Sequence, residues 1–254
     1  MSSVSRVLRQ INFDLLIFRR NPAATFFTVI LPLIFLVLFT SIFGNGELPN
    51  GAKVATVYVP GILTLAIASA TLVNPAITMT TRRERGMLKR VRSTPIPPWV
   101  FVLSQALSGV VLAAIMTVVI TAIGRLLYGV ELQFETIGNL LISLLIGAMA
   151  FSALGLAMTS IIPSEDAAPA VTNAIMLPLY FISGVFVPSG DVPGWVNTVG
   201  NLFPVAHLNQ ALQESYDPFA EGAAWPWNHW LVIAGWGLFG AIATLKTFRW
   251  TPNR

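Results

Sequence analysis

The chain has 254 residues, of which 55% are hydrophobic and only 10% are charged, and its mean hydropathy is +0.72. These values exclude an ordinary soluble domain and indicate an all-α polytopic membrane protein formed by a single transmembrane domain, residues 1–254. Cysteine is absent from the sequence, which excludes disulfides, thiolate catalysis and cysteine-ligated metal centres. The high pI does not indicate a nucleic-acid partner, because the Lys and Arg residues lie beside membrane-length apolar segments.

The first predicted element is an amphipathic helix within residues 1–22. Its apolar residues recur at helical spacing and are Val4, Val7, Leu8, Ile11, Leu15 and Phe18. Polar and basic residues lie between them, which is typical of an interfacial helix along the inner leaflet. The alternative is a short soluble helix packed on the rest of the protein. In both cases Asn21-Pro22 turns the chain into the bilayer.

Six later segments are long and apolar enough to cross a membrane, which takes roughly 20 residues. They are Ala24–Phe43, Val54–Met79, Val100–Ile123, Ile137–Ile162, Ala168–Val187 and Trp230–Thr247. With a cytoplasmic N-terminus, all of the fifteen Lys and Arg residues except Lys53 and Arg125 fall on the cytoplasmic side. The positive-inside rule therefore predicts that both termini are cytoplasmic.

The segment between the fifth and sixth spans, residues 188–228, is too polar to cross the membrane. It nevertheless contains apolar residues at helical spacing, which are Trp195, Val196, Val199, Leu202, Phe203 and Ala206. We expect one or two short re-entrant helices that dip from the outer surface and pack on the helix bundle, because irregular backbone at membrane depth must be covered.

A basic loop, residues 81–98, joins the second and third spans and contains six of the fifteen basic residues of the chain. The second span ends at Arg82, Arg83 and Arg85, and we expect these long side chains to reach headgroup phosphates. Gly86 offers a stop for this helix, and the prolines from Pro95 onward end the next helical segment.

Between these stops the sequence predicts a short amphipathic helix under the membrane. Its small apolar face consists of Met87, Leu88 and Val91, and its basic side consists of Lys89, Arg90 and Arg92. Scattered basic residues would be enough to set the topology, whereas a bracketed helix with an apolar face favours docking of a partner. A loop that serves only topology is the alternative.

Several residues within the spans are candidates for a substrate path or for gating. Pro32 and Pro178 each remove a backbone donor in mid-helix, which indicates either simple kinks or flexing points. The candidate path residues are Phe35, Phe39, Asn74, Asn173, Tyr180 and Phe181. The aromatic residues would suit an apolar or amphiphilic cargo, although such residues also face lipid. The asparagines would equally serve hydrogen bonding between helices.

The sequence contains no motif that would supply energy or catalysis. GELPNGAK, Gly46 to Lys53, resembles a P-loop but has Ala52 where the motif requires Lys. The central parts of the six spans contain no carboxylate, which argues against proton coupling. His207 and His229 lack further ligands at metal-binding spacing, so hydrogen bonding near the headgroups is the favoured interpretation and no metal site is expected.

Three motifs together identify a known family. They are RRERGMLKRVRSTPIPPWVFVLSQ, LPLYFISGVFVPSGDVPGW and FPVAHLNQAL. In these motifs and in the order of its predicted elements, nearly the whole chain resembles the membrane subunits of type-two ABC exporters, the daunorubicin-resistance and polysaccharide-export group. Met87 departs from the pattern, because a small polar residue is expected at that position.

The resemblance implies a coupling role for the basic loop, which in that family sits in a groove of a separate ATPase subunit. The residues to which this role is transferred are Glu84, Arg85, Gly86, Met87, Leu88, Lys89, Arg90, Val91, Arg92 and Thr94. The resemblance also implies a dimer with an identical or related permease and two ATPase subunits, which bind ATP and Mg. Because ATP and Mg belong to the ATPase subunits, this chain is expected to bind no cofactor itself. The resemblance also places the substrate route near the dimer axis, lined by spans one, two and five.

The sequence therefore predicts a permease subunit, without its own ATPase site, in a bacterial plasma membrane. Its expected cargo is a hydrophobic or amphiphilic compound, such as a drug, a lipid or a glycolipid. A gradient-driven carrier is the alternative, and a membrane-embedded enzyme is a third possibility for which no nucleophile or metal set is found.

Overall fold

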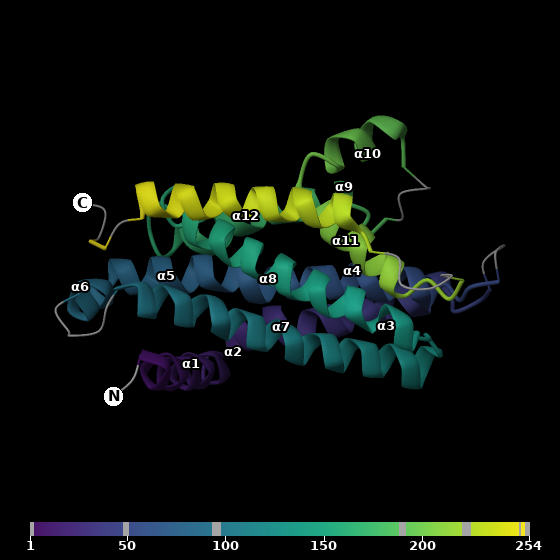
Figure 1. Ribbon diagram of the computed structural model, residues 1–254, viewed down its shortest axis with the longest axis horizontal. Coiled ribbons are helices and arrows are strands. Elements are labelled where there is room, and N and C mark those ends of the chain that lie inside the picture. The colour runs from purple at the N-terminus through teal and green to yellow at the C-terminus, as the bar shows by residue number, and fades with distance from the viewer. Residues whose placement is uncertain are drawn as a thin grey trace.

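The structure, a computed structural model, describes residues 3–47, 51–92, 98–187, 192–219, 225–248 and 250–251. Within these ranges the chain forms helices and turns, with one isolated bridge between Glu47 and Lys53 (Figure 1). The helices are α1 (Ser3–Arg19), α2 (Pro22–Thr25), η1 (Phe26–Ile30), α3 (Leu31–Phe43), α4 (Ala55–Ala68), η2 (Ser69–Val73), α5 (Asn74–Glu84), α6 (Met87–Arg92), α7 (Pro98–Tyr128), η3 (Phe134–Thr136), α8 (Ile137–Met158), α9 (Ala167–Ile182), α10 (Gly194–Gly200), α11 (Pro204–Ser215) and α12 (Trp227–Thr247).

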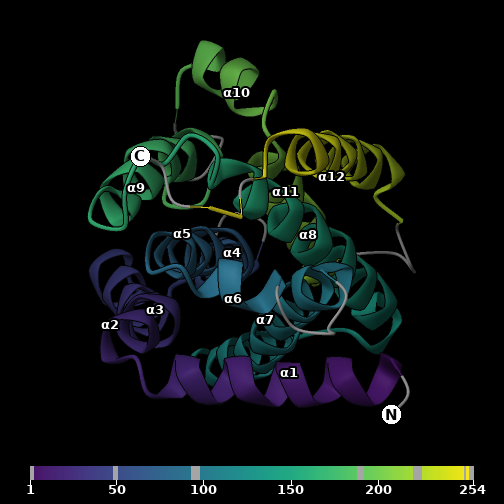
Figure 2. The same ribbon diagram turned by 90° about the vertical axis from the view of Figure 1, so that its left-hand side faces the viewer.

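Helix α1 crosses the long helices of the bundle instead of running along them (Figure 2). It packs on α7, and Asp14 on its inner side is buried while Leu8 and Phe13 are more than half exposed. Four residues of the predicted apolar face are half-buried, namely Val7, Ile11, Leu15 and Phe18. Part of the predicted face therefore packs on the bundle, and the position of α1 at a membrane surface stays a prediction.

Among the residues that the structure describes, five helical stretches are long and apolar enough to span a membrane. They are Pro22–Phe43, Ala55–Glu84, Val100–Tyr128, Phe134–Met158 and Trp227–Thr247. The sixth expected span, Ala168–Val187, forms the shorter apolar helix α9, whose 16 residues are followed by turns. At 1.5 Å per residue α9 is about 24 Å long, which is less than the hydrocarbon thickness of about 30 Å. A sixth crossing therefore stays a prediction.

The first and second spans each contain one wide turn directly before a proline. In η1 the Leu31 amide donates to the Phe26 carbonyl, and in η2 the Asn74 amide donates to the Ser69 carbonyl, five residues earlier in each case. Pro32 and Pro75 come directly after these turns. A proline ring collides with the carbonyl four residues earlier in an α-helix, so the wider π-type turn accommodates each proline without breaking the span.

The second span is the centre of the bundle. In its most apolar part 78% of the residues are buried, compared with 22% in the first and last spans. Two glycines let neighbouring helices approach η2 closely. A Cβ on Gly155 of α8 would lie 2.5 Å from the Leu72 carbonyl oxygen, and a Cβ on Gly109 of α7 would lie 3.2 Å from that of Ala70. The helix that carries the basic loop is thus held on several sides.

Two short helices, α10 and α11, fill the segment before α12, as expected. Helix α11 packs among α4, α8 and α12, and the Trp230 indole of α12 donates to the Ser143 hydroxyl of α8 beside it. Helix α10 projects from the body at the end of the bundle opposite α6 (Figure 1). The short helices exist, and their entry into the membrane stays a prediction.

Candidate functional site at the end of helix α5

The backbone conformation of Gly86 ends the second span. Helix α5 ends at Glu84, and Gly86 has a φ of +69°, in the left-handed region that disfavours residues with a Cβ. The chain then forms α6, Met87–Arg92, so the predicted short helix is confirmed. Thr94 and the side chains of Arg90, Val91 and Arg92 lie outside the described residues.

Leu88 fixes α6 to the bundle. Its side chain is fully buried in a cluster with Met79, Phe101 and Leu156, and Phe248 and Trp250 pack around this cluster. Met87, by contrast, is 40% exposed and Lys89 is exposed. The predicted apolar face is therefore divided, because Leu88 packs inward while Met87 remains on the surface of α6.

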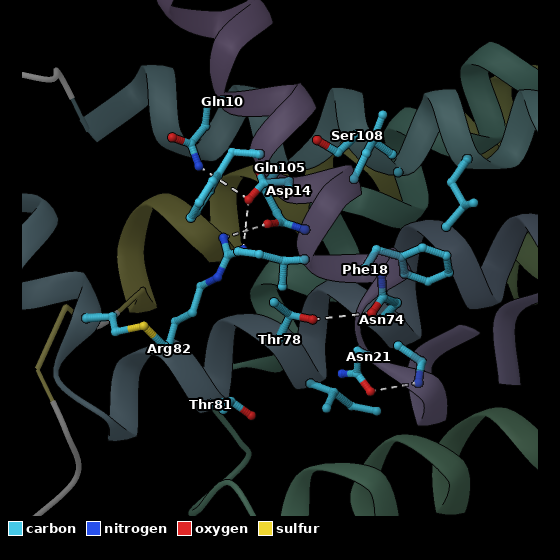
Figure 3. A pocket seen from close by; sticks show the side chains of 18 of the residues that line it. Gln10, Asp14, Phe18, Asn21, Asn74, Thr78, Thr81, Arg82, Gln105 and Ser108 are labelled. Carbon is cyan, nitrogen blue, oxygen red and sulfur yellow. Dashed lines mark hydrogen bonds and ion pairs between the residues drawn. The ribbon is translucent and has the colours of Figure 1, made fainter. Parts of the chain in front are cut away.

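Arg82 joins the end of α5 to α1 (Figure 3). Its guanidinium donates to Asp14 Oδ1 at 2.8 Å and to Gln105 Oε1 at 3.0 Å, and it lies 5.5 Å from the centre of the Phe101 ring. The side chains of Arg82 and Asp14 are both buried. A paired and hydrogen-bonded charge can be buried, whereas an isolated one is very costly.

Arg83 joins the same turn to the end of α8. It is 1% exposed and donates to the carbonyl oxygens of Thr159 at 2.7 Å and Ile162 at 2.8 Å, and to Glu84 Oε1 at 2.8 Å. Thr159 is the residue that caps α8 and Ile162 follows the turn after it, so the guanidinium pairs two carbonyls of the segment that ends this helix. The expectation that Arg82 and Arg83 reach headgroup phosphates is therefore wrong, since both charges are used inside the protein.

Arg85 makes a third link, this time on the surface. Its guanidinium donates to Glu165 Oε2 at 2.9 Å, in the loop between α8 and α9, and its side chain is 63% exposed. The segment from Arg82 to Leu88 thus contacts α1, α7, α8, the loop after α8 and the residues after α12. No local pattern indicates these partners, because Asp14, Thr159 and Glu165 are far away along the chain.

Four of the six predicted path residues gather around Phe186. Phe35, Phe39, Tyr180 and Phe181 have ring centres 5.4, 5.7, 5.8 and 5.0 Å from that of Phe186. Phe186 is buried and lies in the turns after α9, within the predicted fifth span, and was not among the predicted path residues. The cluster joins the first span to α9 with apolar, aromatic surface.

The other two predicted path residues lie elsewhere. Asn74 opens α5 and lines a cavity between α1, α5 and α7, while Asn173 is exposed on α9. The gating candidates also differ from each other. Pro32 is buried directly after the wide turn η1, and Pro178 is exposed inside α9. Neither asparagine takes part in the aromatic cluster around Phe186.

His207 and His229 contact each other near the outer helices. Their Nδ1 atoms are 2.8 Å apart, His207 Nε2 is 2.9 Å from the Asn201 carbonyl oxygen, and His229 Nε2 is 3.6 Å from Glu214 Oε1. Burial raises the pKa of the Glu214 carboxyl. The part of the chain that the structure describes holds no group of three or more His, Asp or Glu residues arranged for a metal ion.

Comparison with known proteins identifies the chain over most of its length, from within α1 to the end of α11. The family model described as ABC-2 type transporter matches residues 10–216, a range that contains Asp14, the whole basic loop, Phe186 and α11. The chain belongs to the ABC-2 type transporter family. It is therefore a membrane subunit of an ABC transporter, and its long apolar helices are those of a multi-pass membrane protein.

Individual permeases are similar along most of their length. The daunorubicin resistance ABC transporter permease protein DrrB1 of Streptomyces coeruleorubidus is 26% identical over 262 residues, which cover 98% of this chain and 87% of the relative. The putative transport permease YvfS of Bacillus subtilis is 22% identical, with coverages of 84% and 85%. The inner membrane transport permease YadH of Escherichia coli K12 is 22% identical, with coverages of 71% and 72%. The resemblance to drug-resistance permeases is thus confirmed at the level of the family.

Proposed function

We propose that this ABC-2 permease subunit exports a hydrophobic or amphiphilic compound and is driven by a separate ATPase subunit that docks on α6. The observation that carries this proposal is the set of links between Arg82–Leu88 and five other parts of the chain. A force applied at α6 reaches α1 through Arg82 and α8 through Arg83. A loop that served only membrane topology would need none of these contacts.

The surface of α6 is suited to a partner. Leu88 anchors the helix from inside, while Met87 and Lys89 are exposed on it. An anchored helix with an exposed apolar residue and several basic residues presents a rigid docking element, which loses little conformational entropy on binding. In the assembled transporter ATP and Mg bind to the partner, because this chain has no phosphate-binding loop of the required sequence.

The orientation is inferred from the charge distribution. The start of α1, helix α6 and the end of α12 lie at one end of the bundle (Figure 1). The positive-inside rule assigns this end, which holds most of the Lys and Arg residues, to the cytoplasm of a bacterial cell. Both termini are then cytoplasmic, and α10 and α11 lie toward the outer surface of the plasma membrane.

The cargo and the dimer are proposed on different grounds. DrrB1 is named for daunorubicin resistance, and the aromatic cluster around Phe186 offers an apolar surface between the first span and α9. Exposed Phe181 and Asn173 on α9 would be covered by a second permease, identical or related, so that the substrate passes near the axis between two copies. A polar amide facing lipid is costly, which supports a protein neighbour at Asn173.

The test is purification of the tagged protein from its native membranes in mild detergent. An ATP-hydrolysing, vanadate-sensitive subunit in equimolar amount is expected, and Arg90→Glu should remove it while leaving the permease in the membrane. Arg125→Glu, at the far end of α7, is the matched control and should retain the ATPase. A permease that purifies alone, and whose transport collapses with the proton gradient, would instead establish a gradient-driven carrier.

A further inference from the structure

A cavity of about 390 Å³ lies under α1, between that helix, α2, α5 and α7 (Figure 3). This volume falls in the range of pockets that bind small molecules, roughly 300–1,000 Å³. The wall has a polar part, which includes Asp14, Asn74 and Gln105, and an apolar part, which includes Phe18 and Leu112. It is separate from the aromatic cluster around Phe186, none of whose members lines it.

The cavity extends along α5 beneath α1. Its lining runs from Arg85, directly after α5, back to Asn74, eleven positions, which is about 16 Å at 1.5 Å per residue. Asp14 and Gln105 lie beside Arg82 toward the end next to α6, and Asn74 lies at the other end. Polar groups are therefore available along the length of the cavity.

The charges in the wall are already paired. Arg82 contacts Asp14 at 2.8 Å and Arg85 contacts Glu165 at 2.9 Å. An anionic head would have to compete with Asp14 for Arg82 and would lie close to a carboxylate, which is unfavourable in a buried site. A cationic head would meet two guanidinium groups. The pairing therefore favours an uncharged head.

The wall keeps hydrogen-bonding capacity that the protein does not use. Asp14 Oδ2 is buried without a hydrogen-bond partner. Asn74 accepts from the Thr78 hydroxyl and Gln105 accepts from Arg82, but neither amide nitrogen donates a hydrogen bond within the described part of the chain. Buried polar groups nearly always have partners, so water or a ligand is expected there. A hydroxyl both donates and accepts and so matches two amide donors and a carboxylate acceptor.

From this combination we propose that the cavity binds one amphiphile with an uncharged, hydroxyl-bearing head and a single apolar chain. The hydroxyls of the head bond to Asn74, Gln105 and Asp14, and the chain lies against Phe18, Ile77 and Leu112. The site holds its ligand at the inner leaflet, beside α5, the helix whose Arg82 contacts Asp14 of α1. The site adjoins the proposed ATPase-docking helix, because Met87 of α6 also lines the cavity.

The experiment uses a monoacylglycerol with a photoactivatable group on its acyl chain, added to the full chain in phosphatidylcholine vesicles. Cross-linked peptides, identified by mass spectrometry, should come from the walls around Phe18, Ile77 and Leu112. Unlabelled monoacylglycerol should compete for the site, and lysophosphatidic acid of the same chain length should compete at least fivefold less well. Better competition by lysophosphatidic acid would overturn the uncharged head, and labelling spread over lipid-facing helices such as α12 would overturn the site.

Matched variants test the assignment of the wall. Asn74→Leu removes an amide from the cavity and should lower site labelling at least fivefold, whereas Asn173→Leu makes the same change on exposed α9 and should leave it unchanged. If Asn74→Leu fails to fold, Ser108→Val in the wall and Ser104→Val outside it form a second pair on α7. Equal labelling within a folded pair would refute the proposal. Since labelling needs no ATPase, this result is independent of the purification test of the proposed function.

Discussion

The carboxylate of Asp14 and the guanidinium of Arg82 lie 2.8 Å apart although 68 positions separate them in the sequence. The pair joins helix α1 to the last turn of the central span. It lies next to α6, so a movement of α6 relative to α1 must carry this pair along or break it.

Removing one partner of this pair should destabilise the protein strongly. Asp14→Asn removes the negative charge beside Arg82 and leaves its guanidinium buried among neutral groups, and the cost should be about 3 kcal/mol, because an uncompensated buried charge remains. Thermal unfolding in detergent, followed by tryptophan fluorescence, measures the loss. The double variant Asp14→Leu with Arg82→Met should recover most of the stability. Glu165→Gln is the control, since its exposed pair with Arg85 contributes at most about 1 kcal/mol.

Arg83 and Arg85 should respond differently to the same conservative change. Arg83→Lys replaces a planar guanidinium that reaches the Thr159 and Ile162 carbonyls with an ammonium that cannot hold both in the same geometry. We expect the melting temperature to fall by several degrees and ATP-driven transport to fall with it. Arg85→Lys should change the melting temperature by less than about one degree. Equal effects of the two variants would contradict the anchoring of α8 by Arg83.

Gly86 offers a test of the turn without any change in packing space. A Cβ added at Gly86 meets nothing within 4 Å, and the same is true of Gly194. Gly86 alone of these two has a positive φ, so Gly86→Ala should cost about 1–2 kcal/mol through the left-handed backbone, while Gly194→Ala should be nearly neutral. The melting temperature and the amount of co-purified ATPase should be measured in parallel for Gly86→Ala and Gly194→Ala. Gly86→Asn should be milder than Gly86→Ala, because asparagine tolerates this conformation better.

Glu214 should give the stability a specific pH dependence. Burial raises the pKa of its carboxyl above the ordinary value of 4.5, so the folded state binds this proton more tightly than the unfolded state. The resulting stabilisation is complete below pH 4.5 and disappears as the pH rises through the folded value. The melting temperature of the wild type should therefore fall relative to that of Glu214→Gln over this interval. A difference that is constant with pH, or that grows in favour of the wild type, would refute the assignment.

The sequence was sufficient for the long helices, the short helix after Gly86 and the family, because these depend on local signals. Apolar length, a glycine stop and closely spaced basic residues can be recognised without knowing the fold. The helix at the start of the chain is also predictable, although the sequence alone presents its inward-facing Asp14 as one polar residue among several and not as a partner for Arg82.

The roles of the arginines could not be predicted. Arg82 and Arg83 are adjacent in a basic run, and nothing local distinguishes a side chain that reaches lipid from one that satisfies the carbonyls at the end of another helix. Phe186 escapes prediction for a related reason, since only tertiary packing brings four aromatic rings to it. The predicted length of α9 is too great, because apolar composition continues through the turns at its end.

The wide turn η2 also sets the rotational phase of the rest of the second span. A π-type turn contains one residue more than an α-helical turn, and one residue corresponds to about 100° of rotation about the helix axis. If the same residues of Ser69–Val73 were instead wound as a regular α-helix, the extra residue would turn α5 by about that angle relative to α4. Arg82 would then point away from Asp14, and Arg83 away from the end of α8, although every side chain of the basic loop would still be present.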